Sequence, residues 1–121
     1  MSRATRPAEF RCRTCDGVAV VVSSQDGGVA TSGFLGTTWL RLERGTTAIR
    51  PADVDRAIAA ADAVALHGLH PEFQPAWCPG CGASYCRAHW QLDVAGADDH
   101  PGWYEATYGT CPDGHRRKLD D

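Results

Sequence analysis

Residues 78–89 read Cys78-Pro-Gly-Cys81-Gly-Ala-Ser-Tyr-Cys86-Arg-Ala-His89 and bring four side chains of metal-binding type into one short stretch. Two cysteines separated by two residues can point both sulfur atoms at one ion from a single turn. The Pro-Gly pair between Cys78 and Cys81, and the glycine after them, suit the tight backbone of such a turn. This stretch therefore predicts a metal-binding turn that is followed at once by a second pair of ligands.

Two more ligand pairs lie elsewhere along the chain. Cys12-x-x-Cys15 precedes the stretch, and Cys111-x-x-x-His115 follows it, so that the four pairs use all 6 cysteines and two of the 5 histidines. Eight ligands fill two tetrahedral sites, which predicts two structural zinc ions, and mixed thiolate and imidazole ligands favour zinc over iron. A single Cys-x-x-Cys pair could also be a redox dithiol or two buried cysteines, but the strand and helix alternation expected around a redox pair is missing.

The spacing of the pairs indicates which of them share an ion. Only four residues separate Cys81 from Cys86, so two sites built from consecutive pairs would force the chain to cross between ions over a very short gap. We therefore expect interleaved pairs, with the consecutive grouping as the alternative that stays open. Site 1 would consist of Cys12, Cys15, Cys86 and His89, and site 2 of Cys78, Cys81, Cys111 and His115. His67-x-x-His70 could replace one pair, but we interpret these histidines as helix-end and loop residues.

Composition limits the class of protein. A chain of 121 residues with 43% hydrophobic and 22% charged residues has the size and balance of one globular domain. The formal net charge of -3 argues against nucleic-acid binding, and the basic residues at 116–118 are interpreted as a solvated face. We find no signal-peptide pattern and no apolar stretch of membrane-spanning length, which predicts a cytoplasmic protein without a membrane partner. In that compartment six cysteines are metal ligands rather than disulfides. Richness in Ala, Arg, Gly and Asp indicates a bacterial source.

The remaining pattern predicts an α+β fold. We expect a flexible tail over residues 1–10 and a single zinc-binding domain over 11–121, with a strand and helix insert at 16–76. Apolar runs bounded by glycine predict strands at 18–22, 29–34 and 37–42, and apolar residues at helical spacing predict one main helix over 51–66. The end of the chain is expected to turn at Cys111 into a short helix. The result would be a small domain with a short antiparallel sheet, one main helix and two interleaved zinc sites.

The ligand framework resembles the cross-braced double-zinc modules, of which RING fingers are the best known, and the broader treble-clef class. The resemblance covers residues 12–15 and 77–115 and does not cover 16–76. It implies that the late pair, Cys111 and His115, enters a helix. It also implies a link to ubiquitin ligases, because Arg116 stands where RING ligases often carry an arginine that bridges the conjugating enzyme and ubiquitin. The stretch from Tyr85 to Trp90 is also similar to uncharacterised bacterial proteins.

The function expected from these features is that of a non-catalytic zinc module that binds another protein. Four protein ligands leave an ion no open coordination position for activating water, which argues against an enzyme. A hydrolytic site would need one pair to be broken, for example by His67 or His100 with Glu72 as the base. The candidate partner surface consists of Trp39, Trp90, Trp103 and Arg116. For Trp90 and Trp103 the alternative is packing around the metal sites. A ubiquitin-ligase-like adaptor and, with less support, a nucleic-acid-binding zinc protein are the alternative functions.

Overall fold

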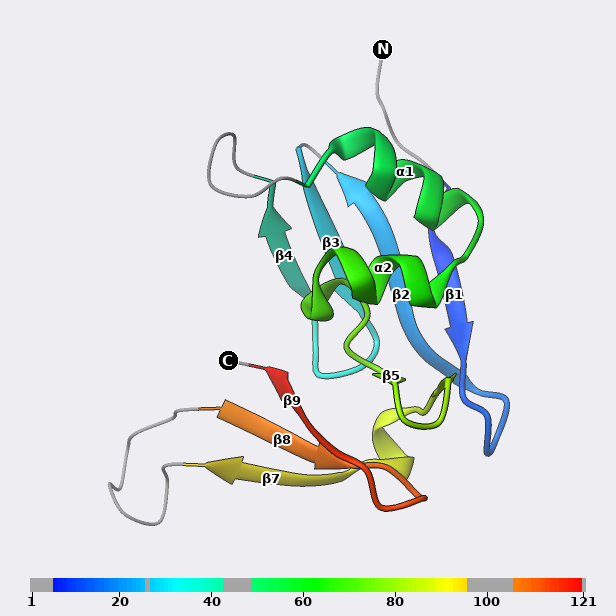
Figure 1. Ribbon diagram of the computed structural model, residues 1–121, viewed down its shortest axis with the longest axis vertical. Helices are drawn as coiled ribbons and strands as arrows, with labels where there is room; N and C mark the ends of the chain where they lie inside the picture. Colours follow the sequence, from blue (N-terminus) through cyan, green and yellow to red (C-terminus); the bar gives the residue numbers. More distant parts are fainter. Residues whose placement is uncertain (1–5, 26, 43–48, 96–105, 121) are drawn as a thin grey trace.

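A computed structural model describes residues 6–25, 27–42, 49–95 and 106–120 of the protein. The first half of the molecule is built from two layers. One layer is an antiparallel sheet with the strand order β1 (Ala8–Arg11), β2 (Val18–Gln25), β3 (Gly28–Ser32) and β4 (Thr38–Arg41). The other layer consists of helices α1 (Pro51–Ala59) and α2 (Ala63–Leu69), which lie across one face of this sheet (Figure 1). A short 3-10 helix, η1 (Pro71–Phe73), follows them.

The prediction of a flexible tail over residues 1–10 is wrong for its last three residues. Strand β1 pairs with β2, and the alternation of its side chains buries Ala8 and Phe10 while Glu9 and Arg11 stay exposed. Phe10 is only 6% exposed, because it enters the core beside the β-branched side chains of β2. Residues 1–5 of the predicted tail lie outside the described residues.

The helix predicted over residues 51–66 is two helices. Pro51 at the first turn and Asp53 beside it start α1, as the sequence indicates. The chain then turns at Ala61, which has a φ of 49°, and the Asp62 carboxylate accepts a hydrogen bond from the backbone N–H of Ala65 at 3.0 Å. This carboxylate caps a new helix and so ends the continuity that the apolar spacing predicted.

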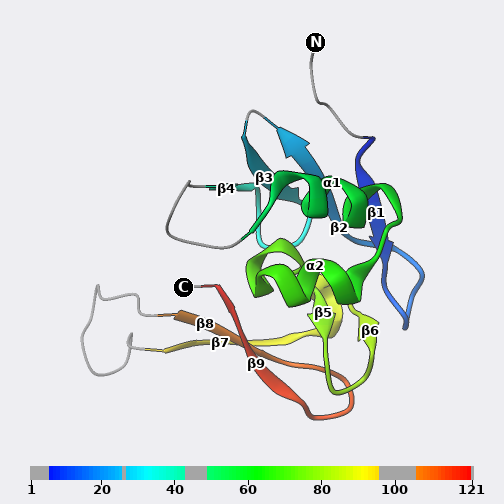
Figure 2. The same cartoon turned by 45° about the horizontal axis from the view of Figure 1, so that its top comes forward.

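The second half of the molecule is built from short antiparallel strands. A small hairpin pairs β5 (Trp77–Cys78) with β6 (Ala83–Ser84), and a second 3-10 helix, η2 (Arg87–His89), leads into a three-stranded sheet. That sheet consists of β7 (Gln91–Ala95), β8 (Ala106–Thr110) and β9 (Arg116–Asp120) (Figure 2). The predicted terminal helix is therefore wrong, because residues 116–120 pair with β8. The fold is α+β, and its described residues form three antiparallel sheets where the sequence predicted one.

Aromatic side chains join the two halves. The Phe34 ring meets the Trp90 ring edge-on, with 6.5 Å between centroids, and the Tyr85 ring also meets Trp90 edge-on, at 6.1 Å. The indole N–H of Trp90 donates to the backbone carbonyl of Tyr85 at 2.9 Å, so its polar atom is satisfied inside the core. Gly109 of β8 makes room for this packing, because a Cβ there would lie 2.9 Å from the Trp90 ring and 2.4 Å from Leu119.

Candidate metal centres

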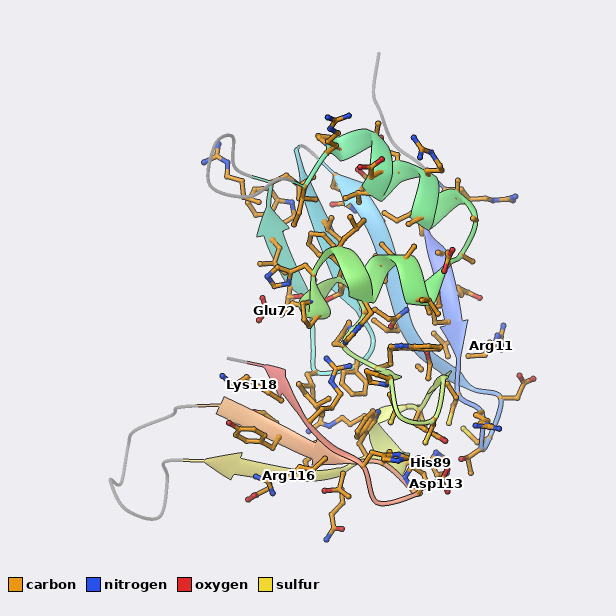
Figure 3. The ribbon with its side chains drawn as sticks, in the orientation of Figure 1. Arg11, Glu72, His89, Asp113, Arg116 and Lys118 are labelled. Carbon is orange, nitrogen blue, oxygen red and sulfur yellow. The ribbon has the colours of Figure 1, made fainter. Side chains whose placement is uncertain are left out.

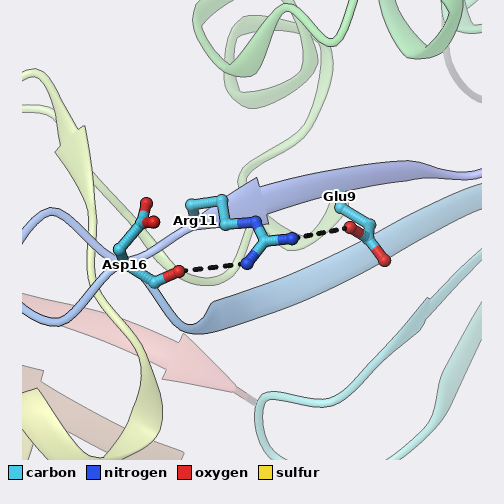
Figure 4. Close-up of polar contacts among 3 residues, drawn as sticks. All are labelled: Glu9, Arg11 and Asp16. Atoms are coloured by element: carbon cyan, nitrogen blue, oxygen red, sulfur yellow. Dashed lines mark hydrogen bonds and ion pairs between the residues drawn. The ribbon is translucent and has the colours of Figure 1, made fainter.

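The first ligand turn connects β1 to β2. Backbone hydrogen bonds close it, from Asp16 N–H to the Cys12 carbonyl at 2.8 Å and from Cys12 N–H to the Gly17 carbonyl at 2.7 Å. Asp16 has a φ of 61°, in the left-handed region that aspartate tolerates better than most residues. The Arg11 guanidinium donates to the Asp16 carbonyl at 3.1 Å and pairs with Glu9 at 3.4 Å, which ties the turn to the strand before it (Figure 4).

Site 1 is completed by the 3-10 helix η2, far away in sequence. The Sγ atoms of Cys15 and Cys86 lie 3.7 Å apart. The His89 Nδ1 atom lies 3.0 Å from Cys86 Sγ and 3.4 Å from Cys12 Sγ. The four ligand atoms of Cys12, Cys15, Cys86 and His89 all lie within 4.8 Å of one another.

Site 2 is formed where two hairpin turns meet. One turn joins β5 to β6 and carries Cys78 and Cys81, and the other joins β8 to β9 and carries Cys111 and His115. Cys81 Sγ lies 3.6 Å from Cys111 Sγ, and the His115 Nδ1 atom lies 3.2 Å from the first sulfur and 3.4 Å from the second. Each turn contains a glycine with positive φ, at Gly82 (64°) and at Gly114 (91°).

These distances fit a four-coordinate ion. Two sulfur atoms bound at about 2.3 Å at the corners of a tetrahedron lie about 3.8 Å apart, close to the 3.7 and 3.6 Å in the two clusters. A disulfide would bring the sulfur atoms to about 2.05 Å, and all six cysteines are free. The two clusters could therefore hold metal ions. Their membership is the interleaved grouping expected from the spacing, so the alternative of consecutive pairs is wrong.

Backbone N–H groups prepare two thiols for deprotonation. Burial alone would raise the pKa of Cys12, but hydrogen bonds from the backbone at Cys86 and Cys15 lower the pKa to about 6. At Cys111 burial is again opposed by backbone hydrogen bonds, from His115 and Asp113, and the pKa falls to about 7. A thiol must lose its proton to bind a metal, so these backbone contacts shift both cysteines toward the ligating form.

Cys81 differs from these two thiols. The Tyr85 hydroxyl would lower its pKa, but burial and the Asp113 side chain raise the pKa to about 12. The same contact with Cys81, together with burial, raises the pKa of Tyr85 to about 12. Cys81 thus holds its proton more firmly than Cys12 and Cys111 do.

A glycine allows site 2 to close. The His115 ring packs directly on Gly80, where a Cβ would lie 2.8 Å from two ring carbons and 2.9 Å from Nε2. Any other residue at this position would push the imidazole away from the cluster. The sequence points to Gly80 as a turn residue, but it does not reveal this contact with a ring 35 residues further along.

Arg13 connects the two centres. Its backbone N–H donates to the Ser84 carbonyl at 2.9 Å, and its guanidinium donates to the Cys81 carbonyl at 3.3 Å. A residue from inside the first ligand turn is therefore bonded to the hairpin that carries the first half of site 2. The two centres form one connected unit even though they share no ligand.

The structure buries one residue of the candidate partner surface and leaves two others exposed. The prediction that Trp90 lies on the partner surface is wrong, because Trp90 is 4% exposed and part of the core. Trp39 is 49% exposed and stays a candidate. Arg116 is exposed, but it pairs with Asp93 at 3.2 Å and its guanidinium carbon lies 4.6 Å from the centre of the Tyr108 ring (Figure 3). The other two candidates named from the sequence, Trp103 and the hydrolytic His100, lie outside the described residues.

His67, His70 and Glu72 do not join a metal cluster in the described part of the chain. They line a separate pocket of about 490 Å³ together with Arg117 and Lys118 of β9. The backbone N–H of Glu72 donates to His70 Nδ1 at 3.1 Å, so this histidine caps η1, as a loop residue does. The hydrolytic arrangement therefore has no cluster of ligands to support it among the residues that the structure describes.

Sequence reasoning missed the role of Arg117. The interpretation of residues 116–118 as a solvated face is wrong at this position, because the Arg117 guanidinium donates to the backbone carbonyls of Trp77 and Gln74. Desolvation by burial lowers the pKa of this arginine. It ties β9 to the segment that enters β5. A strand at residues 116–120 would turn alternate side chains toward the core, and only that alternation could have indicated that Arg117 points inward. The sequence instead predicts a helix for this segment.

Comparison with known proteins adds the family. Within the described residues, none of the helices has the length and apolar character of a membrane-crossing segment. No curated protein and no solved structure matches the chain. A family model matches residues 2–121, and the chain therefore belongs to the family described as "Domain of unknown function (DUF8328)".

Proposed function

We propose that this protein is a non-catalytic module in which two structural zinc ions shape a surface that binds another protein. The donor sets support zinc, because three thiolates and one imidazole suit a tetrahedral zinc site. Each cluster supplies four protein ligands, so an ion held there has no open position at which to activate water. The ions would stabilise the fold and take no part in a reaction.

The observation that carries the binding role is an exposed indole beside an apolar pocket. Trp39 borders a pocket of about 200 Å³, whose apolar lining includes Phe34, Leu35 and Leu40. The indole is held in place, because its N–H donates to the Gln25 carbonyl at 3.2 Å and its ring lies against Gly28. A fixed tryptophan beside an apolar recess has the character of an interface hot spot, since little side-chain entropy is lost on binding.

The neighbouring pocket indicates the chemistry of the partner. Glu72 and Leu119 line both pockets, so the apolar recess lies next to the pocket that holds Arg117 and Lys118. A segment that placed an apolar side chain near Trp39 could reach these two cations with an acidic side chain. We therefore propose that the partner is a protein segment carrying an apolar and an acidic residue close together.

The test compares partner binding by matched variants. Proteins captured from the source cells by the zinc-loaded chain would be purified, and their affinity would be measured by titration calorimetry. Trp39→Ala should weaken binding at least tenfold, the loss typical of a hot-spot residue. Leu35→Ala serves as a second variant because it changes the same pocket without uncovering Gly28.

Val64→Ala is the control. Val64 is 64% exposed on α2 and does not line the recess, so its truncation removes an exposed apolar side chain elsewhere on the surface. Equal affinity of the wild type, Trp39→Ala and Leu35→Ala for every captured protein would overturn the proposed surface.

A ubiquitin-ligase-like adaptor is the second candidate. The interleaved order of the ligands supports it, since this is the order of cross-braced RING modules. Two features weaken it: residues 116–120 are a strand, and the Arg116 side chain is engaged by Asp93 and Tyr108. If the adaptor role holds, Arg116→Ala abolishes ubiquitin transfer while two zinc ions stay bound. Unchanged transfer would exclude it.

A further inference from the structure

A carboxylate touches one of the ligand sulfurs. Asp113 lies in the turn between Cys111 and His115, and its Oδ2 atom is 3.2 Å from Cys81 Sγ. The Asp113 oxygen is therefore as close to this sulfur as the candidate ligand nitrogen is, since His115 Nδ1 also lies 3.2 Å from Cys81 Sγ. Asp113 and His115 are both exposed, so this side of site 2 faces solvent (Figure 3).

The contact has a consequence for a metal-loaded protein. It brings a carboxylate oxygen against the sulfur atom that would bind the ion. Carboxylate oxygen is itself a zinc ligand, at about 2.0 to 2.2 Å. The arrangement therefore places a competing ligand against the bond between Cys81 and the ion.

Site 1 has no such neighbour in the described part of the chain. Asp16 follows the ligand Cys15 directly, but the contact found for it runs through its backbone carbonyl, which accepts from Arg11. The two sites have the same donor set of three cysteines and one histidine. A difference in how fast they exchange metal would therefore point to Asp113.

Resting on the zinc loading proposed above, we propose that the ion of site 2 is exchangeable as well as structural. Asp113 makes site 2 the exchange site by replacing Cys81 as a ligand while zinc is passed to another thiolate- or nitrogen-bearing acceptor. In this substitution a bond from the ion to Asp113 Oδ2 forms as the bond to Cys81 Sγ breaks. The released thiolate takes up one proton from water, and no electron is transferred. Asp113 thus lowers the barrier to zinc transfer at site 2, while site 1 retains its ion.

The experiment measures zinc release from the full-length, zinc-loaded protein into excess 4-(2-pyridylazo)resorcinol, followed by absorbance. The wild type should release two zinc ions in two separate phases. Asp113→Asn should slow the fast phase about tenfold, the lower end of the effect of altering a group beside metal ligands. Asp113→Glu keeps a carboxylate and should keep a fast phase.

Asp16→Asn is the matched control, since it removes the same charge beside a ligand of site 1. It should leave both rates unchanged. In the cadmium-113 NMR spectrum of the cadmium-loaded protein, Asp113→Asn should shift one of the two resonances, and Asp16→Asn should shift neither by a comparable amount. Circular dichroism confirms that each variant is folded. A single release phase in the wild type, or unchanged or faster release from Asp113→Asn, would overturn the proposal.

Discussion

The two halves of the molecule are held together by different means. Residues 8–73 bury a continuous apolar cluster between sheet and helices, in which Val20, Val54 and Leu66 are fully buried. Among the described residues of 77–119, the large apolar side chains that are buried are Tyr85, Trp90 and Leu119, and two further buried residues, Cys78 and Cys111, belong to the candidate metal clusters. A segment of roughly 40 residues cannot bury enough surface to be stable alone, and metals commonly supply the difference. The comparison predicts that the second half depends on its ions much more than the first does.

Metal removal should separate the halves most strongly. Each structural zinc contributes on the order of 10 kcal/mol of apparent folding free energy, against a total stability of about 5 to 15 kcal/mol. We expect complete chelation to abolish amide protection over residues 77–115, with residual protection confined to β2, β3 and the helices. Hydrogen exchange read by mass spectrometry would show this. Native circular dichroism and tryptophan fluorescence in verified metal-free protein would contradict it.

Loss of one ligand should distinguish the two sites. Site 2 joins two hairpins of the second half, whereas site 1 joins that half to the β1–β2 turn. Cys78→Ser should therefore lower the melting temperature more than Cys12→Ser. Loss of site 2 unfolds both hairpins, whereas loss of site 1 only detaches the second half from the β1–β2 turn. Native mass spectrometry should find one zinc ion in each variant. Equal losses of melting temperature would refute this order.

A cavity in the core of the first half should lower the stability of the protein without lowering its zinc content. Ile58 is 1% exposed beneath α1, and its truncation to alanine should destabilise the protein by about 2 to 5 kcal/mol. The zinc content should stay at two, because Ile58 belongs to the sheet-and-helix core. Val64→Ala, at an exposed position on α2, is the control and should change little. Denaturant unfolding gives the free energies, and loss of zinc from Ile58→Ala would show that the halves are not separable.

Gly80→Ala should weaken site 2 through the His115 ring alone. The new methyl group would lie 2.8 Å from the ring, and relief of such crowding typically costs about 1 to 3 kcal/mol. Gly68→Ala is the matched control on α2, where nothing lies within 4 Å, and it should be neutral or slightly stabilising. Zinc affinity by competition with a chelator is the measurement, and equal affinities would show that the ring can move freely.

His67 should give the smallest effect, as a dependence on pH. Burial and the nearby Arg117 charge lower the pKa of His67 below its ordinary value of 6.5. The unfolded chain therefore binds more protons than the folded protein just below pH 6.5, and stability falls as the pH drops through that window. His67→Gln should reduce this slope in denaturant melts between pH 5 and 7, values chosen around that pKa. An unchanged slope would mean that the imidazole titrates normally.

The sequence predicts the two Cys/His clusters because chain connectivity restricts how the four pairs can group. The short gap between Cys81 and Cys86 leaves interleaving as the easier geometry, and the structure groups the ligands that way. Strands β2 and β3 are likewise readable, since a β-branched run meets a glycine turn. Both inferences depend on local geometry over a few residues.

The errors arise where distant partners decide the outcome. Residues 116–120 carry a charged pattern with no strong preference, and pairing with β8 makes them a strand. Strand β1 offers only a four-residue alternation, which becomes visible once Phe10 is known to be buried. The contact of Asp113 with Cys81 joins two turns that are 32 residues apart, so spacing alone cannot reveal it. Trp90 became a core residue because Phe34 and Tyr85 enclose it.

The interleaved order of the four pairs also determines when each candidate site can form during translation. The strands of the first sheet end at Arg41, so this sheet and its helices can assemble while later residues are still being added by the ribosome. Site 1 cannot close before His89 has emerged, and site 2 must wait for His115. Capture of the proposed zinc ions would therefore be a late event. A nascent chain in zinc-starved cells would then present a finished sheet followed by an unstructured, thiol-rich segment open to oxidation and proteolysis.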